Sequence, residues 1–379
     1  MGIPRMKFSI SKSEFQRGLA RIQSIVEKRN TMPILANVLL EAGGSAKSGQ
    51  LDLAATDLEV GIRGTHACKV EKKGSATASA KKLFEIVREL PDEPVSVSVS
   101  DNAYLTICCA RAKFTLAGTT ADEYPTLPAF SPERTVTVQA AVLGEMIERT
   151  MYAASSDETR YNLNGVYLEK LEEPGKLRMV ATDGHRLAYI DRTFGAELDG
   201  LADGVIIPRK GLAELKRLVD EDDADEVEIG FEGNNGLARK GGVTLVMRLI
   251  EGEFPNYRQV VPSEAQIALT LPTEPLSHAL RRVALLSAER SRAVKLELSA
   301  RQLSLSSNNP DLGDAREELD VDYDGEPLSI AFNARYLMDA LAVCRAKEVR
   351  LIFKDPLSPT QLVPTDDPDS LAVVMPMRL

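Results

Sequence analysis

The chain repeats one order of secondary structure three times, and this repeat constrains its fold more than any other feature. An alternating segment at 7–10 precedes Ser11 and an amphipathic run at 14–26, which predicts a strand, a cap and a helix. The same order returns at 135–138 and again at 267–270, each time followed by a helical apolar stripe. The copies begin about 130 residues apart, so the period predicts three structural units.

A second strand and helix occur in the middle of each unit, and alternating strands follow them. The strand and helix segments are 77–90, 205–219 and 328–343, and the strands that follow are 95–99, 227–231 and 349–353. Period-two stretches joined by Gly, Asn and Asp turns predict antiparallel strands. We therefore expect an α+β fold of three repeated domains, each with two helices over antiparallel sheets of about eight strands. The expected domains are 1–133, 134–264 and 265–379.

The composition of the 379 residues is that of a globular protein, with 44% hydrophobic and 27% charged residues. No run of about 18 apolar residues occurs and residues 1–10 lack the apolar core of a secretory signal, so we expect a cytoplasmic protein without a membrane segment. The four cysteines form no C-x-x-C pair, which argues against a disulfide framework or a zinc site. A net charge of −10 argues against a uniformly basic nucleic-acid binder, but it does not report where the charges lie.

The segment 181–188 is the most suggestive of chemistry, because it places Asp183, His185 and Arg186 around Gly184. In a hydrolase, His185 would be a general base oriented by Asp183. No nucleotide-binding glycine motif, H-E-x-x-H or G-x-S-x-G accompanies them, and the three histidines are spread over the three units. The alternative is a turn in which Asp183 caps and Gly184 supplies a positive φ.

The last residues, 372–379, form an apolar stretch that reads as an edge strand of a core. Methionine-rich apolar surface is also typical of adaptable peptide-binding grooves, and Pro376 prevents continued ladder pairing. The tail is therefore a candidate partner site.

From Met6 onward the sequence resembles the bacterial DNA sliding clamp family, the beta subunit of DNA polymerase III. The resemblance rests on motifs spread along the chain: 6–8 (MKF), 32–37 (MPILAN), 56–59 (TDLE), 160–165 (RYNLNG), 181–188 (ATDGHRLA), 208–211 (PRKG), 254–257 (FPNY), 308–310 (NNP) and 373–379 (VVMPMRL). Met1 to Arg5 precede the resemblance, and we expect them to be an alternative start or an added extension.

This resemblance implies a non-catalytic processivity factor without a cofactor, in which two chains join head to tail into a six-domain ring around duplex DNA. Domain one of each chain would meet domain three of the other. The implied interface residues are Arg111, Lys113, Phe114 and Leu116 on one side and Leu285, Leu286, Asp311, Asp314 and Glu317 on the other. Gly313 and Arg316 depart from the acidic residues usual at their positions.

Helices inside such a ring would touch DNA phosphates without reading base sequence. The contacts implied by the matched motifs are Arg29, Arg160, Tyr161, Arg209 and Lys210. Weaker candidates, carried on helices, are Lys12, Arg21, Lys82, Arg149, Arg217, Arg281 and Arg345. Asn162 stands where relatives can have a second tyrosine. Weak, salt-sensitive contacts suit a sliding ring, because topology retains it on DNA.

The resemblance also implies a groove between domains two and three for clamp-binding peptides of the polymerase III alpha subunit, the clamp loader, other polymerases and repair proteins. Apolar walls would bury leucine and phenylalanine anchors while a few polar groups fix the backbone. The matched positions are Leu163, Thr182, Gly184, His185, Arg186, Leu187, Pro255, Val260, Val373, Val374, Met375, Pro376, Met377 and Arg378. Gln259 and Pro359 depart from the Arg and Ser expected there.

Two alternatives from other classes stay open at this point. A hydrolase would use Asp183 and His185, but it needs a nucleophile or a metal that the sequence does not offer. A three-domain protein scaffold without a DNA function would lack a basic inner surface.

Overall fold

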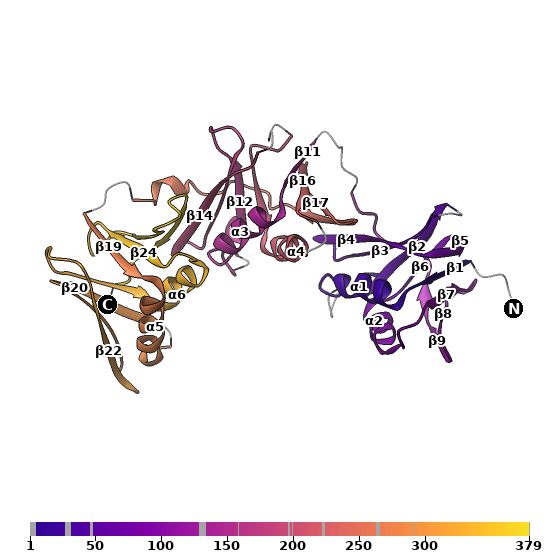
Figure 1. Ribbon diagram of the computed structural model, residues 1–379, viewed down its shortest axis with the longest axis horizontal. Helices are drawn as coiled ribbons and strands as arrows, with labels where there is room; N and C mark the ends of the chain where they lie inside the picture. The colour runs from indigo at the N-terminus through magenta and orange to yellow at the C-terminus, as the bar shows by residue number, and fades with distance from the viewer. Residues whose placement is uncertain are drawn as a thin grey trace. The chain divides into compact units, whose positions relative to one another are not determined.

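The structure is a computed structural model that describes residues 5–26, 32–45, 48–128, 134–157, 159–195, 198, 200–221, 224–262, 266–289 and 291–378. Its elements follow the predicted order three times, with two α-helices and two groups of antiparallel strands in each copy (Figure 1). The predicted α+β class and the threefold repeat are confirmed.

The first repeat has more strands than the other two. Its strands are β1 (Met6–Ile10), β2 (Asn37–Ser45), β3 (Ser48–Thr56), β4 (Val60–Ala67), β5 (Lys69–Lys72), β6 (Gly74–Ser79), β7 (Val95–Val99), β8 (Leu105–Cys109), β9 (Ala112–Leu116) and β10 (Gly118–Thr119). Its helices are α1 (Lys12–Ile22) and α2 (Ala80–Glu89), with a 3-10 turn η1 (Pro33–Ala36).

The second and third repeats have the same order of elements. The second contains β11 (Thr135–Gln139), α3 (Ala140–Met151), η3 (Tyr161–Leu163), β12 (Gly165–Lys170), β13 (Lys176–Thr182), β14 (Arg186–Thr193), β15 (Gly204–Pro208), α4 (Arg209–Val219), β16 (Glu226–Glu232), β17 (Asn235–Lys240), β18 (Val243–Arg248) and η4 (Tyr257–Gln259). The third contains β19 (Ile267–Pro272), α5 (Thr273–Val283), η5 (Ala284–Leu286), β20 (Ala293–Ser299), β21 (Gln302–Asn309), β22 (Gly313–Asp320), β23 (Leu328–Asn333), α6 (Ala334–Val343), β24 (Glu348–Phe353), β25 (Thr360–Pro364) and β26 (Ser370–Val374).

Local sequence explains where the helices begin and which side they bury. The Ser11 hydroxyl accepts the Glu14 amide at 3.3 Å, which satisfies an otherwise unbonded donor at the start of α1. Phe15, Leu19 and Ile22 form one buried stripe of that helix. The Asn333 side chain caps α6 in the same way by accepting the Arg335 amide at 3.0 Å. Short polar caps followed by an apolar stripe therefore account for both elements.

Two of the four sheets continue from one repeat into the next. One sheet has the order β10-β6-β2-β3-β4-β18-β17-β16-β11, and another has the order β15-β12-β13-β14-β26-β25-β24-β19. The other two sheets, β5-β1-β7-β8-β9 and β22-β21-β20-β23, belong to the first and third repeats alone. β4 pairs with β18, and β14 pairs with β26. Because of these pairings, the chain forms two compact units, and each unit contains part of the middle repeat. These units are 1–140 with 213–249, and 141–212 with 250–379.

A histidine is buried beneath α1 in the first of these units. His66 on β4 is 3% exposed, and its Nδ1 lies 3.3 Å from the Glu14 carboxylate. Its Nε2 has no hydrogen-bond partner among the described residues. A Cβ on Gly18 would lie only 2.4 Å from this nitrogen, so glycine is what allows the helix to pass over the ring.

Acidification from pH 7 to pH 5 is expected to lower the free energy of unfolding through His66. Burial holds the pKa of His66 below its ordinary value, although the hydrogen bond to Glu14 opposes this shift, and the charges of Arg21 and Arg17 add to it. A histidine whose pKa is lowered by folding binds a proton more readily in the unfolded state. The free energy of unfolding therefore keeps its full value above about pH 6.5 and falls as the pH drops below that value.

Chemical denaturation at both pH values measures this effect in the wild type, in His66→Gln and in His278→Gln. The His66 variant should lose less stability on acidification, whereas the change at the exposed His278 should leave the wild-type response intact. An equal loss in all three proteins would assign the pH dependence to other groups.

Candidate functional site

The segment 182–186 forms a tight turn between β13 and β14. The Thr182 hydroxyl donates to the Arg186 carbonyl at 2.6 Å and accepts the Gly184 amide at 3.1 Å. The Asp183 carboxylate accepts the amides of His185 and Arg186 at 2.9 and 3.0 Å. Gly184 has a φ of 86°, in the left-handed region that glycine favours. The turn alternative of the sequence analysis is therefore confirmed, and Asp183 binds the backbone of His185 instead of its ring.

The first repeat contains the same turn at 56–60. Thr56 donates to the Val60 carbonyl at 3.0 Å and accepts the Leu58 amide at 3.0 Å, while Asp57 accepts the amides of Glu59 and Val60 at 2.9 and 2.7 Å. Leu58 takes the place of the glycine with a φ of 79°. The repeat therefore extends to individual hydrogen bonds, so each residue of the second turn has a structural counterpart in the first.

The carboxyl-terminal segment lies against the turn at 182–186. Strand β26 ends at Val374, and the Met375 amide then donates to the His185 carbonyl at 2.9 Å. Pro376 has no amide to donate, and Met377 donates to the Ala331 carbonyl of β23 at 2.7 Å. The segment is thus fixed by single hydrogen bonds on both sides of the proline, and Met375 stays 36% exposed.

The predicted groove residues differ in how far they reach the surface. Gly184, His185, Pro255, Val260, Met375 and Arg378 are exposed, and Leu163, Thr182, Arg186, Pro376 and Met377 are half-buried. Leu187, Val373 and Val374 are buried, at 2%, 2% and 1% exposure. The structure brings Leu187 and Val373 together with Tyr257 in one apolar cluster. Leu187, Val373 and Tyr257 therefore belong to the apolar core that supports the strands and the loop carrying the exposed positions.

A buried ionic network fastens the loop that carries Pro255 and Val260. The Tyr257 hydroxyl donates to Glu169 and accepts from Arg178 at 3.1 Å, and Arg178 binds Asp191 with two hydrogen bonds of 2.6 and 2.7 Å. Burial, together with the bond to Glu169, raises the pKa of Tyr257 to about 12. Burial alone would lower the pKa of Arg178, but the bonds to Asp191 and Tyr257 raise it above its ordinary value. The loop is therefore held in place by charge-assisted bonds.

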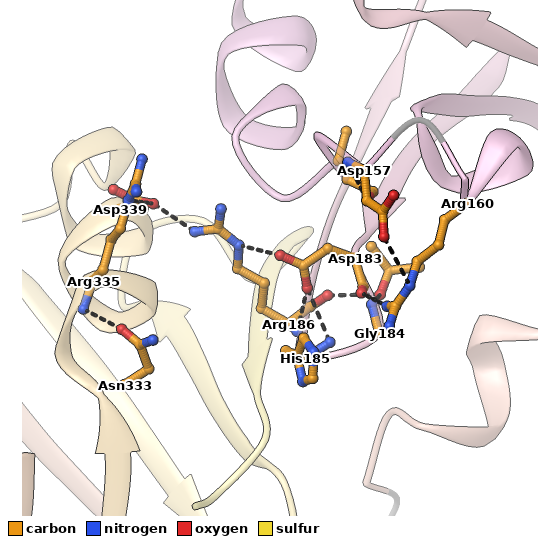
Figure 2. Close-up of polar contacts among 12 residues, drawn as sticks. Asp157, Arg160, Asp183, Gly184, His185, Arg186, Asn333, Arg335 and Asp339 are labelled. Carbon is orange, nitrogen blue, oxygen red and sulfur yellow. Dashed lines mark hydrogen bonds and ion pairs between the residues drawn. The ribbon is translucent and has the colours of Figure 1, made fainter. Parts of the chain in front are cut away.

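The side chain of Arg186 is enclosed by residues that the sequence analysis did not single out. Its guanidinium binds Asp183 at 3.1 Å and Asp339 of α6 at 2.5 Å (Figure 2). It lies 4.7 Å from the ring centre of Tyr336 and 5.5 Å from that of Tyr152. The His185 ring stacks on Tyr336 at 6.3 Å. Only the i, i+3 spacing of Tyr336 and Asp339 on one helix could have suggested this role.

A pocket of about 570 Å³ is lined by residues of both predicted sites. Arg160 and Arg209 are predicted DNA contacts, and His185 and Arg186 are predicted groove residues. Arg160 donates to the Asp183 carbonyl at 2.6 Å, and Arg209 donates to the Ala154 carbonyl at 2.8 Å (Figure 2 for Arg160). Of the remaining predicted DNA contacts, Tyr161 and Lys210 do not line this pocket. Tyr161 is 58% exposed, Lys210 is half-buried, and Arg29 lies outside the described residues.

Five of the seven weaker candidates form ion pairs within the chain, and two of these five, Arg149 and Arg21, are largely buried. Arg149 is 8% exposed and binds Glu145 at 2.9 Å and Asp367 at 2.6 Å, so its selection as an accessible phosphate contact was wrong. Arg21 is 15% exposed and binds Glu221 through both ends of its guanidinium. Helical position alone does not separate such arginines from solvated ones.

The predicted interface residues lie on or next to two edge strands, except for Leu285 and Leu286, which lie on η5. β9 is the last strand of its sheet and carries the exposed Lys113 and Phe114, and Arg111 precedes it. β22 is the last strand of the other single-repeat sheet and carries Asp314 and Glu317, with Asp311 before it. Leu285 is 75% exposed, Phe114 is 39% exposed, and Leu116 and Leu286 are half-buried. Glu317 already binds Arg282 of its own chain at 2.5 and 2.9 Å.

Within the described part of the chain, His, Cys, Asp and Glu side chains nowhere gather in a group of three or more that could hold a metal ion. Among the same residues, every helix is too short or too polar to span a bilayer.

Three repeats of two helices on antiparallel sheets, with sheets that continue between repeats, define the sliding-clamp class of protein. Family models for the N-terminal, central and C-terminal domains of the DNA polymerase III beta subunit match residues 6–128, 137–256 and 258–378. The chain belongs to this family, whose members are non-catalytic processivity factors.

Relatives resemble the chain along its full length. The beta sliding clamp of Caulobacter vibrioides is 39% identical over 99% of this chain and 100% of its own, and that of Escherichia coli K12 is 34% identical over the same shares. The solved Caulobacter crescentus clamp, which holds PEG in its proposed beta-motif tethering region, has 39% identity and a TM-score of 0.93. The Pseudomonas aeruginosa clamp bound to griselimycin has 36% identity and a TM-score of 0.91, and both structures match 99% of this chain and 100% of their own.

Proposed function

We propose that the chain acts as a head-to-tail dimeric ring that encircles duplex DNA and tethers polymerases through a peptide groove. The observation that carries the proposal is that the charged interface residues of the two ends of the chain lie on or next to two edge strands, β9 in the first repeat and β22 in the third. An open strand edge can pair with a strand of another chain. Because the two edges differ, each chain offers one of each kind, and such contacts close into a ring when the rotation permits.

The charges of the two edges are complementary. Arg111 and Lys113 make the β9 edge positive, whereas β22 carries four acidic residues, Asp314, Glu317, Glu318 and Asp320, against one arginine. Opposite charges would steer the two edges together, and the apolar Phe114 and Leu285 would supply buried contact. The proposed ring contains six domains with boundaries at 133/134 and 264/265 in each chain.

The proposed contacts with DNA are few and act on phosphates. The candidates within the described residues are Arg160, Tyr161, Arg209 and Lys210, and the fifth candidate, Arg29, lies outside them. Two of these arginines already donate to backbone carbonyls, so a phosphate would receive only their remaining donors. Weak phosphate contacts fit the net charge of −10, because a closed ring needs no tight binding to stay on DNA.

The groove is proposed to bind peptides of the polymerase III alpha subunit, the clamp loader and other polymerases and repair proteins. Val260 and Met375 are exposed and apolar, and Met375 is hydrogen-bonded to His185 of the 182–186 turn, which fits a ligand with apolar anchors. The PEG in the tethering region of the Caulobacter crescentus clamp supports a ligand site in this family.

Retention on circular and linearised DNA tests the ring directly. After loading by a compatible clamp loader with ATP at moderately high salt, the protein should stay on circles and leave cut molecules through their ends. Equal retention on both would mean direct binding instead of encirclement. No retention despite an active loader would favour a scaffold without a DNA function.

Replacing Met375 and Pro376 by alanine is expected to weaken binding of a polymerase III alpha peptide about tenfold, because it removes exposed apolar surface and the break in the strand ladder. Fluorescence polarisation with a labelled peptide measures the affinity, and sedimentation velocity measures the dimer in parallel. The dimer should be unaffected. Equal loss of both would argue against a separate groove.

A further inference from the structure

We propose that Asp339, on α6 of the third repeat, is a positioning residue for the peptide groove and acts through Arg186 of the second repeat. The inference rests on the proposed function, since it assigns a residue to the proposed groove. Asp339 was not among the residues matched to the groove by sequence. Its partner Arg186 immediately follows His185 and begins the strand that pairs with β26.

Two carboxylates fix the guanidinium of Arg186 in its plane. Its Nε donates to Asp183 at 3.1 Å and its Nη1 donates to Asp339 at 2.5 Å (Figure 2). The Arg186 side chain is only 10% exposed, so few other orientations are open to it. Of its five N–H donors, the two on Nη2 have no partner among the described residues. These two, together with the second N–H of Nη1, are the donors left for an oxygen of a bound peptide.

Two aromatic rings restrict the guanidinium out of its plane. The Tyr336 ring centre lies 4.7 Å away and the Tyr152 ring centre 5.5 Å away, and the cation is attracted to both ring faces. Tyr336 also stacks on His185, so one residue of α6 contacts two neighbouring groove residues. Helix α6 of the third repeat therefore positions His185 and Arg186, which belong to the second repeat.

The first pair of repeats lacks this arrangement, although its turn is the same. Glu214 is the sixth residue of α4, as Asp339 is the sixth of α6. Glu214 binds Ser24 at 2.8 Å and Arg217 at 2.6 Å, and Val60 occupies the position that corresponds to Arg186. Among the described residues, the bond between helix and turn therefore accompanies the exposed Met375 segment and is not repeated at the 56–60 turn, which favours a role in the groove over general packing.

A double-mutant cycle tests whether Asp339 acts through Arg186. The probe is a fluorescein-labelled clamp-binding peptide of the polymerase III alpha subunit, measured against the full-length wild type, Asp339→Ala, Arg186→Ala and the double variant. We expect Asp339→Ala to weaken binding about 5- to 10-fold, and to add less than about twofold when Arg186 is already alanine. Asp339→Asn, which keeps an acceptor without its charge, should fall between the wild type and alanine.

Glu214→Ala makes the matched change on α4 and should leave peptide affinity within about twofold of the wild type. Circular dichroism and sedimentation velocity check that every variant is a folded dimer. Wild-type affinity in Asp339→Ala, or an equal loss with and without Arg186, would overturn the inference while leaving the groove intact. If the wild type fails to bind the peptide, the groove itself is wrong and the inference falls with it.

Discussion

Leu285→Asp is expected to convert the dimer into monomers, raising the dissociation constant at least about 100-fold. Leu285 is 75% exposed in the single chain, so the substitution should leave the fold intact. In the proposed ring the same side chain would be buried against the partner's β9 edge near Phe114. An unpaired carboxylate buried at an apolar contact costs several kcal/mol, which corresponds to at least about two orders of magnitude in affinity.

Sedimentation velocity over a concentration series measures this change. Leu357→Asp is the matched control, because Leu357 is 70% exposed but lies in the turn between β24 and β25 and belongs to neither of the edge strands β9 and β22. The control should remain a dimer. A dimer of wild-type strength in Leu285→Asp would place the interface elsewhere on the chain.

Arg178→Met is expected to lower the free energy of unfolding by about 3–5 kcal/mol, because it leaves the buried Asp191 carboxylate without its cation. Asp191 and Glu169 are 6% and 8% exposed, and Arg178 contacts Asp191 directly and Glu169 through Tyr257. Methionine keeps much of the side-chain volume, so lost charge, not a cavity, dominates the effect. The loop with Pro255 and Val260 should also exchange its amide hydrogens faster.

Urea denaturation measures the stability and hydrogen exchange measures the loop. Arg63→Met removes an arginine that also binds two carboxylates, Glu41 and Asp52, but the Arg63 side chain is 43% exposed. Solvent screens this exposed pair, so we expect a loss of no more than about 1 kcal/mol. Similar losses in both variants would mean that burial does not set the strength of the Arg178 network.

Local features of the fold could be predicted from the sequence because they depend on neighbouring residues. Ser11 predicted a helix start and caps α1, although the helix ends at Ile22 and not at the predicted Val26. The 182–186 turn was one of two alternatives, and its hydrogen bonds involve residues at most four positions apart. Pro376 predicted the end of strand pairing, and β26 ends two residues before it.

Contacts between distant residues could not be predicted in the same way. Arg186 and Asp339 are 153 positions apart, and nothing in either local pattern indicates the other. The Tyr257 network joins residues of three strands and a loop, so its members resemble ordinary strand residues in the sequence. The family resemblance predicted which residues line a groove and an interface. It did not identify the side chains that contact Arg186 or the arginine that binds Glu317.

The pairing of β4 with β18 and of β14 with β26 has a mechanical consequence. Cutting the chain at the sequence boundaries would expose two strand edges at each cut, and bare edges favour aggregation. A pulling force along the chain would be shared by a ladder of backbone hydrogen bonds at each of these strand pairs, instead of falling on one covalent linker. The repeats are therefore joined by paired strands as well as by the covalent chain, so force applied to the ends would have to break backbone hydrogen bonds before neighbouring repeats separate.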